Sequence, residues 1–309
     1  MAATIESHGP AIQTRGLTKH FGDVRALQDL DLTVERGEIF GFLGPNGAGK
    51  TTTMRTMLDL IRPTSGTATI VGLDSHRDAV EIRRHIGFLP GDLALYPNLT
   101  GRQLITYFAN LRGGVDWSFV DQLAERLNAD LDVKISDYST GNRQKVGLIQ
   151  AFMNKPDLVM LDEPSTGLDP LVQQEFQSIL REIAREGRTV FLSSHTLSEV
   201  DRVADRVGII RRGRLAVVET MEALKQKAIR HVTLVFATPV PADVFTGVPG
   251  VLEASQDGTK VKLAFKGPMT ELLRVAADHE VINLNSSEAD LEEIFLAHYR
   301  DADDREAAA

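Results

Sequence analysis

Short apolar runs alternate with helical patterns over the first 220 residues of the chain. Residues 38–43 (EIFGFL), 158–161 (LVML), 189–193 (TVFLS) and 207–210 read as buried strands, and residues 51–60 and 171–185 read as helices between them. Strands that are covered on both faces are almost continuously apolar, as these runs are. The pattern therefore predicts an α/β domain with a mainly parallel sheet and helices on both of its faces.

The pattern changes between Pro90 and Pro156, where helical periodicity dominates. Helices are predicted over residues 101–111, 119–127 and 143–154. We interpret residues 91–155 as a helical subdomain that is inserted into the sheet domain, which as a whole covers residues 1–225.

A second, smaller α/β domain is expected over residues 229–299. Asp257-Gly258 is a typical hairpin turn between strands 252–256 and 259–265, and residues 231–237 form a further apolar run. Residues 270–279 and 287–299 have helical spacing, and Ser287 with Asp290 resembles a capping pair. These elements predict a β-α-β-β-α-β order with an additional helix. Residues 300–309 are expected to form an acidic tail.

Composition agrees with two globular domains. The 309 residues are 42% hydrophobic and 25% charged, an ordinary balance for folded proteins. The absence of cysteine excludes disulfides, Cys-ligated metals and thiol catalysis. The net charge of −9 argues against a nucleic-acid partner, which normally meets a basic face, and residues 221–309 hold 15 acidic and 9 basic residues.

No segment has the sequence of a membrane span. The longest stretch without Asp, Glu, Lys or Arg covers residues 231–242, 12 residues with two prolines, whereas a spanning helix needs about 20 apolar residues. The N-terminus has neither the basic region nor the apolar core of a secretory signal. We therefore expect a cytoplasmic protein whose role at a membrane would depend on a partner.

Residues 44–51 (GPNGAGKT) match the pattern G-x-x-x-x-G-K-[ST]. Glycines allow backbone amides to approach phosphate oxygens, and the helix predicted next directs its positive end at the anion. A glycine turn that matches by chance is the alternative, but the position between a predicted strand and a predicted helix favours ATP. The residues assigned to ATP are Gly44, Asn46, Gly47, Ala48, Gly49, Lys50, Thr51 and Thr52.

Two acids, Asp162 and Glu163, follow the apolar run 158–161. A strand that ends in acids is often only structural, but here a phosphate loop precedes it in the chain. Asp162 and the Thr51 hydroxyl are expected to hold Mg²⁺, and Glu163 is expected to act as general base on the attacking water.

His195 follows the run 189–193 and could hydrogen-bond the γ-phosphate and orient the water. Position alone does not separate this role from that of a structural or solvent-exposed histidine. Both interpretations remain open at this point.

Together these residues resemble the ATP-binding subunits of ABC transporters, over about residues 11–220. Residues 138–145 (YSTGNRQK) are similar to the family's LSGGQ-type signature. The resemblance implies that Ser139 and Gly141 close over ATP held by a second ATP-binding subunit, with an identical copy as the favoured partner, in a head-to-tail dimer. Residues 165–169 (STGLD) match the loop that crosses this dimer interface.

The resemblance assigns two further residues and shows two departures. Phe21 matches the aromatic residue that stacks on adenine, although a core phenylalanine is the alternative, and His195 matches the switch histidine. Gly91 stands where the family usually has a glutamine or glutamate that helps to ligate Mg²⁺, and Thr140 replaces the first signature glycine. Both departures bear on the rate of hydrolysis and not on nucleotide binding.

The segment LALYPNLTGRQ and the C-terminal LEEIFLAHY resemble one branch of the family, the exporters of drugs, antibiotics or lipids with separate ATPase and membrane chains. We therefore expect a motor subunit that acts on a multi-span permease, with the docking groove near residues 93–111. The alternatives are a soluble ATPase of the same superfamily that acts on DNA or ribosomes, and a small-molecule kinase.

Overall fold

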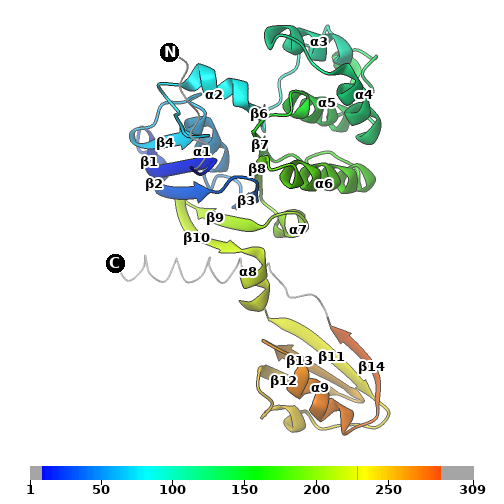
Figure 1. Ribbon diagram of the computed structural model, residues 1–309. Helices are drawn as coiled ribbons and strands as arrows, with labels where there is room; N and C mark the ends of the chain where they lie inside the picture. Colours follow the sequence, from blue (N-terminus) through cyan, green and yellow to red (C-terminus); the bar gives the residue numbers. More distant parts are fainter. Residues whose placement is uncertain (1–8, 228, 287–309) are drawn as a thin grey trace. The chain divides into compact units, whose positions relative to one another are not determined.

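The computed structural model describes residues 9–227 and 229–286 (Figure 1). The chain divides into two compact units after Val218. This division falls within β10 (Arg214–Thr220), ahead of the boundary that the sequence pattern suggested near residue 225.

A six-stranded sheet forms the centre of the first unit, in the order β10-β9-β3-β8-β7-β6. The pairs β3–β8, β3–β9, β7–β8 and β6–β7 are parallel, which confirms the expected mainly parallel sheet. Every residue of the three central strands is buried. The strands are β3 (Ile39–Leu43), β6 (Ile86–Leu89), β7 (Leu158–Asp162), β8 (Thr189–Ser194) and β9 (Arg206–Arg211).

A second, antiparallel sheet was not predicted from the sequence. Its order is β2-β1-β4-β5, and its strands are β1 (Ile12–Phe21), β2 (Val24–Val34), β4 (Ser65–Ile70) and β5 (Leu73–Asp74). Helix α1 (Lys50–Met57) packs against both sheets, and its Met54 and Met57 lie in one apolar cluster with Ile12 of β1 and Phe42 of β3 (Figure 1). This packing fixes the N-terminus of α1 at the end of β3.

The predicted helical subdomain is present. Its helices are α3 (Gly101–Leu111), α4 (Trp117–Arg126) and α5 (Thr140–Phe152), with a 3₁₀ turn η1 (Ile135–Asp137) before α5. Side-chain caps define where they begin: Thr100 for α3, Asp116 for α4 and Ser139 for α5. The other helices of this unit are α2 (Ala79–His85), α6 (Pro170–Arg185) and α7 (Leu197–Asp201).

The second unit contains an antiparallel sheet in the order β12-β13-β11-β14. Helix α9 packs its buried Leu272 and Ala276 into the apolar core of this unit. The elements are α8 (Met221–Lys227), β11 (Arg230–Phe236), β12 (Val251–Asp257), β13 (Lys260–Phe265), α9 (Thr270–Ala277) and β14 (Val281–Ser286).

Two details of the expected order were wrong. The first expected helix is only a 3₁₀ turn, η2 (Ala242–Phe245), because prolines and glycines crowd this connection. Asp257 pairs with Lys260, so Gly258 and Thr259 form the hairpin turn, one residue later than predicted. The expected helix 287–299 and the tail 300–309 lie outside the described residues.

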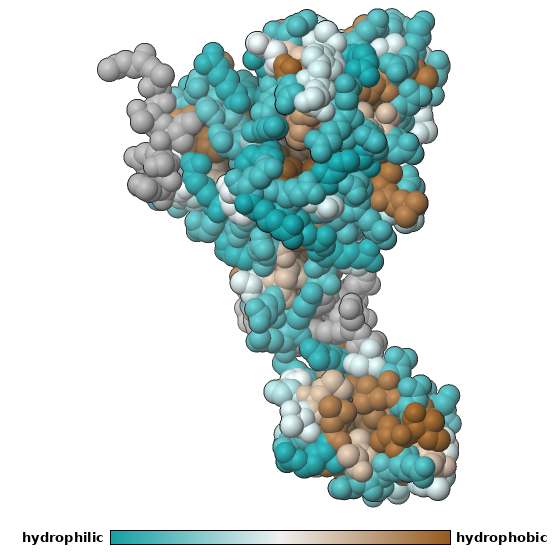
Figure 2. Space-filling model, turned by 45° about the vertical axis from the view of Figure 1, so that its right-hand side comes forward, coloured by the Kyte–Doolittle hydropathy of each residue, from teal (hydrophilic) through white to brown (hydrophobic). Residues whose placement is uncertain are grey.

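Apolar side chains remain on the surface of the second unit. Figure 2 shows an apolar area on the face of this unit that is turned to the viewer. Among the described residues of this unit, the exposed large apolar ones are Val244, Leu252, Leu273, Val281, Ile282 and Leu284. An exposed apolar area of this kind is typical of a surface that contacts another protein.

Candidate functional site

The phosphate loop connects β3 to α1, with Gly49 immediately before the helix. Gly49 has a φ of 112°, and a Cβ atom there would lie 2.7 Å from the carbonyl oxygen of Ala26. A Cβ atom on Gly44 would lie 2.5 Å from the carbonyl oxygen of Ile210. The loop therefore requires glycine at both positions, and it leads directly into a helix N-terminus whose first amides have no partner within the helix.

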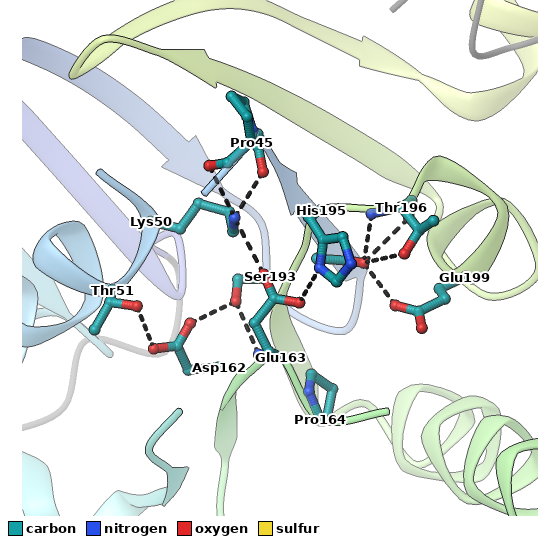
Figure 3. Close-up of polar contacts among 12 residues, drawn as sticks. Pro45, Lys50, Thr51, Asp162, Glu163, Pro164, Ser193, His195, Thr196 and Glu199 are labelled. Carbon is teal, nitrogen blue, oxygen red and sulfur yellow. Dashed lines mark hydrogen bonds and ion pairs between the residues drawn. The ribbon is translucent and has the colours of Figure 1, made fainter. Parts of the chain in front are cut away.

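Lys50 is buried beneath this loop, with 5% of its side chain exposed. Its Nζ donates to the carbonyl oxygens of Gly44 (2.6 Å) and Pro45 (3.2 Å) and lies 3.1 Å from Glu163 Oε1 (Figure 3). The ammonium thus connects the loop to the end of β7.

Asp162 is 1% exposed and accepts two hydrogen bonds from hydroxyl groups. Thr51 Oγ1 donates to Asp162 Oδ2 at 2.7 Å, and Ser193 Oγ donates to Asp162 Oδ1 at 2.6 Å (Figure 3). Asp162 and Ser193 are register partners on the parallel strands β7 and β8. The sheet therefore places the Asp162 carboxylate between Thr51, at the start of α1, and Ser193 of β8.

Glu163 adopts a left-handed backbone conformation, with a φ of 51°. Its amide donates to Ser193 Oγ at 3.0 Å, and its Oε2 lies 2.7 Å from Nδ1 of His195 (Figure 3). His195 is 52% exposed, at the end of β8. The structure thus brings His195 against the carboxylate of Glu163, which sequence position alone left open.

A pocket of about 370 Å³ opens beside these residues. Its walls include Lys50, Thr51 and Glu163. The other lining residues are Val24, Arg25, Ala26, Gln28, Pro45, Asn46, Gly47, Gly49, Thr52 and Arg212. Six of the eight residues assigned to ATP thus line a common cavity with Glu163, whereas Gly44 and Ala48 are not among its lining residues.

Phe21 is 49% exposed at the end of β1, and Lys19 Nζ lies 4.8 Å from the centre of its ring. Its register partner Val24 lines the pocket, whereas Phe21 itself is not among the lining residues. The alternative of a core phenylalanine is therefore wrong, and the ring lies at the turn that borders the pocket.

Ser139 and Gly141 are not part of this cluster. Ser139 caps α5 by accepting from the amide of Asn142 at 3.1 Å. A Cβ atom on Gly141 would lie 2.6 Å from the carbonyl oxygen of Gly167, so the start of α5 packs on the loop 165–169. These two motifs, distant in sequence, form one surface.

Gly91 lies directly against Asp162. A Cβ atom at this position would lie 3.0 Å from Asp162 Oδ2. The neighbouring Asp92 is 90% exposed and pairs with Nη2 of Arg55 at 2.9 Å. The Asp92 carboxylate therefore pairs with a side chain of α1, and it is Gly91, not Asp92, that lies against Asp162.

Two residues that contribute to the site were not predicted from the sequence. Ser193 bonds both Asp162 and Glu163, and its only sequence signal is its place at the end of the run 189–193. Gln144 of α5 donates to the carbonyl oxygens of Glu163 (3.3 Å) and Pro164 (3.0 Å). Nothing in the local sequence indicates that contact, because the partners lie on a different element.

A phosphate loop, two carboxylates at the end of the buried strand β7 and a helix, α5, that begins in the signature-like segment together define an ATP-binding cassette. The family model described as "ABC transporter" matches residues 27–166. The bacitracin transport ATP-binding protein BcrA of Enterococcus faecalis is 34% identical over 299 residues, covering 92% of this chain and 94% of that protein. The chain belongs to the ABC transporter family, as an ATP-binding subunit with ATPase activity.

Other similar proteins support the same family assignment. A daunorubicin resistance ATP-binding protein of Streptomyces coeruleorubidus is 39% identical over 220 residues, covering 70% of each chain. A solved structure of the ATP-binding subunit of an ABC transporter is 27% identical with a TM-score of 0.64, covering 70% of this chain and 92% of the other. A bacterial ABC transporter cassette whose solved structure is described as dimeric has the same fold, with a TM-score of 0.63 at 23% identity, covering 68% of this chain and 98% of the other.

Proposed function

We propose that this chain is the motor subunit of an exporter whose permease is a separate membrane protein. One observation carries the proposal: Lys50, Glu163 and His195 form one connected line of contacts beside the phosphate loop. Relatives named for bacitracin transport and daunorubicin resistance support antibiotics or similar drugs as the cargo.

The residues divide the chemistry between binding and water activation. The loop amides and Lys50 bind the phosphates of ATP, with Lys50 exchanging its present acceptors for phosphate oxygens. Glu163 accepts a proton from the attacking water as the bond between the γ-phosphorus and the bridging oxygen breaks, which yields ADP and inorganic phosphate. His195 orients the Glu163 carboxylate and the water.

The residues at Asp162 fit a magnesium ion. Mg²⁺ prefers oxygen ligands and is usually bound by one or two carboxylates together with substrate phosphates. The buried Asp162 carboxylate and the Thr51 hydroxyl, in contact at 2.7 Å, are ligands of this type. When bound, the ion would neutralise charge on the phosphates.

A second copy of the chain completes the site in this proposal. Ser139 and the amide of Gly141 lie at the N-terminus of α5, where an anion is favoured. They would close over ATP held by the phosphate loop of the other copy, with the loop 165–169 between them. The cassette of the same fold whose solved structure is described as dimeric supports the pairing of two copies. Phe21, at the border of the pocket, would stack on the adenine.

The permease would dock beside α3, on the cytoplasmic side of the membrane. None of the helices in the described part of the chain is long and apolar enough to cross a bilayer. A pocket of about 230 Å³ is lined by residues of α2, β6, α3 and α5 and of the segment after α1, and its walls combine apolar residues with Gln150 and two arginines, Arg83 and Arg112. The exposed Tyr96 and Tyr107, whose ring centres are 5.8 Å apart, extend the aromatic surface next to Phe108 of the pocket.

Size-exclusion chromatography of the Glu163→Gln variant tests the proposal. This variant should bind ATP, hydrolyse it at least 100-fold more slowly than the wild type, about the effect expected for loss of a general base, and elute as a dimer only with ATP. Adding Ser139→Arg should abolish the dimer and leave nucleotide binding intact. Wild-type turnover in Glu163→Gln would refute the assignment of the base, and an unchanged dimer in the double variant would refute the role of Ser139.

A further inference from the structure

Gln144 is a buried polar side chain of α5, with 8% of its surface exposed. Its Nε2 donates to the carbonyl oxygens of two successive residues, Glu163 at 3.3 Å and Pro164 at 3.0 Å. Both acceptors follow directly after β7. A single amide of the signature helix thus holds the backbone segment that carries the Glu163 carboxylate.

The backbone at Glu163 is in a conformation that needs support. Its φ of 51° lies in the left-handed region, which residues other than glycine occupy when their surroundings hold them there. Ser193 Oγ accepts from the Glu163 amide, and Gln144 donates to the Glu163 carbonyl. The peptide groups on both sides of Glu163 are therefore fixed by side chains from two different elements.

The helix that carries Gln144 also carries the signature loop. Ser139 caps α5, and Gln144 lies five residues further on, about 7.5 Å along a rigid helix. The start of the helix also packs through Gly141 on Gly167. A displacement of the N-terminus of α5 would therefore reach Gln144 and the segment it holds.

We propose that Gln144 is a positioning residue for hydrolysis that couples the two ATP sites of the dimer. It holds the Glu163 backbone so that the carboxylate stays against Lys50 and His195. When Ser139 closes over the ATP of the other copy, α5 transmits this closure to the base of its own site. This inference rests on the proposed function, because it takes Glu163 as the base and Ser139 as a contact to the partner's nucleotide.

Steady-state ATP hydrolysis by the full-length Gln144→Met variant is the first test. Methionine has a similar length but donates no hydrogen bond. We expect kcat at least tenfold lower, the KM for ATP within about twofold of the wild type, and an intact ATP-driven dimer in the Glu163→Gln background. Gln256→Met is the matched control, since it also removes a glutamine Nε2 that donates to a carbonyl oxygen, that of Gly258 in the second unit, and it should leave kcat unchanged.

The Gln144→Glu variant separates positioning from packing. An ionised carboxylate at this place would face two carbonyl oxygens, whereas its protonated form could donate to them, and burial favours the protonated form. For Gln144→Glu, we expect the ratio of its kcat to the wild-type kcat to rise as the pH falls from about 8.5 to about 6. The same ratio for Gln144→Met should not change with pH. A flat ratio for both variants would overturn the proposal.

Failure of this inference differs from failure of the proposed function. If Gln144→Met retains wild-type kcat while Glu163→Gln does not turn over, Glu163 is the base but Gln144 does not position it, and the inference is overturned. If Glu163→Gln itself turns over normally, the proposed function fails and the inference fails with it.

Discussion

His195 and Glu163 are in contact through Nδ1 and Oε2 at 2.7 Å, although 32 positions separate them in the chain. Glu163 directly follows β7, and His195 directly follows β8, the parallel neighbour of β7. Because Lys50 holds the other carboxylate oxygen at 3.1 Å, the carboxylate lies between two cationic or hydrogen-bonding groups.

The first prediction concerns this contact. His195→Ala should lower the rate of ATP hydrolysis about 10- to 100-fold, because Glu163 loses one of the two groups that orient it. ATP affinity should change little, since Lys50 and the loop amides remain. Turnover and nucleotide binding would be measured side by side, with the surface variant His76→Ala as control. Equal turnover in both variants would contradict a role for His195.

Gly91 is the subject of the second prediction. Because a Cβ atom there would lie 3.0 Å from Asp162 Oδ2, Gly91→Ala should displace this carboxylate and lower hydrolysis several-fold without much change in ATP affinity. Gly91→Gln should be faster than Gly91→Ala, since its amide could take the place of the family's usual ligand. Asp92→Ala should match the wild type, because Asp92 pairs with Arg55. A rate loss in Asp92→Ala alone would instead assign the contact to Asp92.

The third prediction concerns Arg126, which joins α4 to α6. Its guanidinium donates to both carboxylate oxygens of Glu182 at 2.6 and 2.8 Å and also pairs with Glu175. These hydrogen bonds lower the pKa of Glu182 below its usual 4.5. A lowered carboxyl pKa stabilises the fold above pH 4.5, and this contribution is lost as the pH falls through the lowered pKa.

Arg126→Met should therefore lower the free energy of unfolding at pH 7, by about 1 kcal/mol because the pair is partly exposed. The difference from the wild type should shrink as the pH falls below 4.5. Denaturant unfolding at several pH values measures this, with the more exposed Arg102→Met as control. A difference that stays constant with pH would show that packing, and not the ion pair, is responsible.

The fourth prediction concerns a chain that ends at Thr220. This truncation keeps β10 complete, and every residue assigned to ATP precedes it. We expect a folded unit that binds ATP with nearly wild-type affinity, together with a weaker ATP-driven dimer, because the removed unit has an exposed apolar surface. Calorimetric titration and size exclusion measure the two effects. Loss of ATP binding in a folded truncation would contradict the assignment.

Local patterns were sufficient for much of the fold and of the candidate site. The phosphate loop is one contiguous segment, and so is the Asp162-Glu163 pair. Each lies next to an apolar strand that the hydrophobic pattern predicts. The helices α3, α4 and α5 also carry their own periodicity and caps. The antiparallel sheet was missed, since β1 and β2 alternate irregularly and are interrupted by register shifts.

The order of residues along the chain is enough to show which residue types lie at the ends of the predicted strands and helices, and so indicates the class of chemistry. Their partners depend on the three-dimensional fold: Ser193 bonds Asp162, His195 contacts Glu163, and Gln144 donates to the Glu163 carbonyl oxygen. These contacts depend on which strands are neighbours, on their register, and on how α5 packs against the end of β7. Such relationships arise from long-range packing, because contacts between distant segments form only when whole elements bury their apolar faces together.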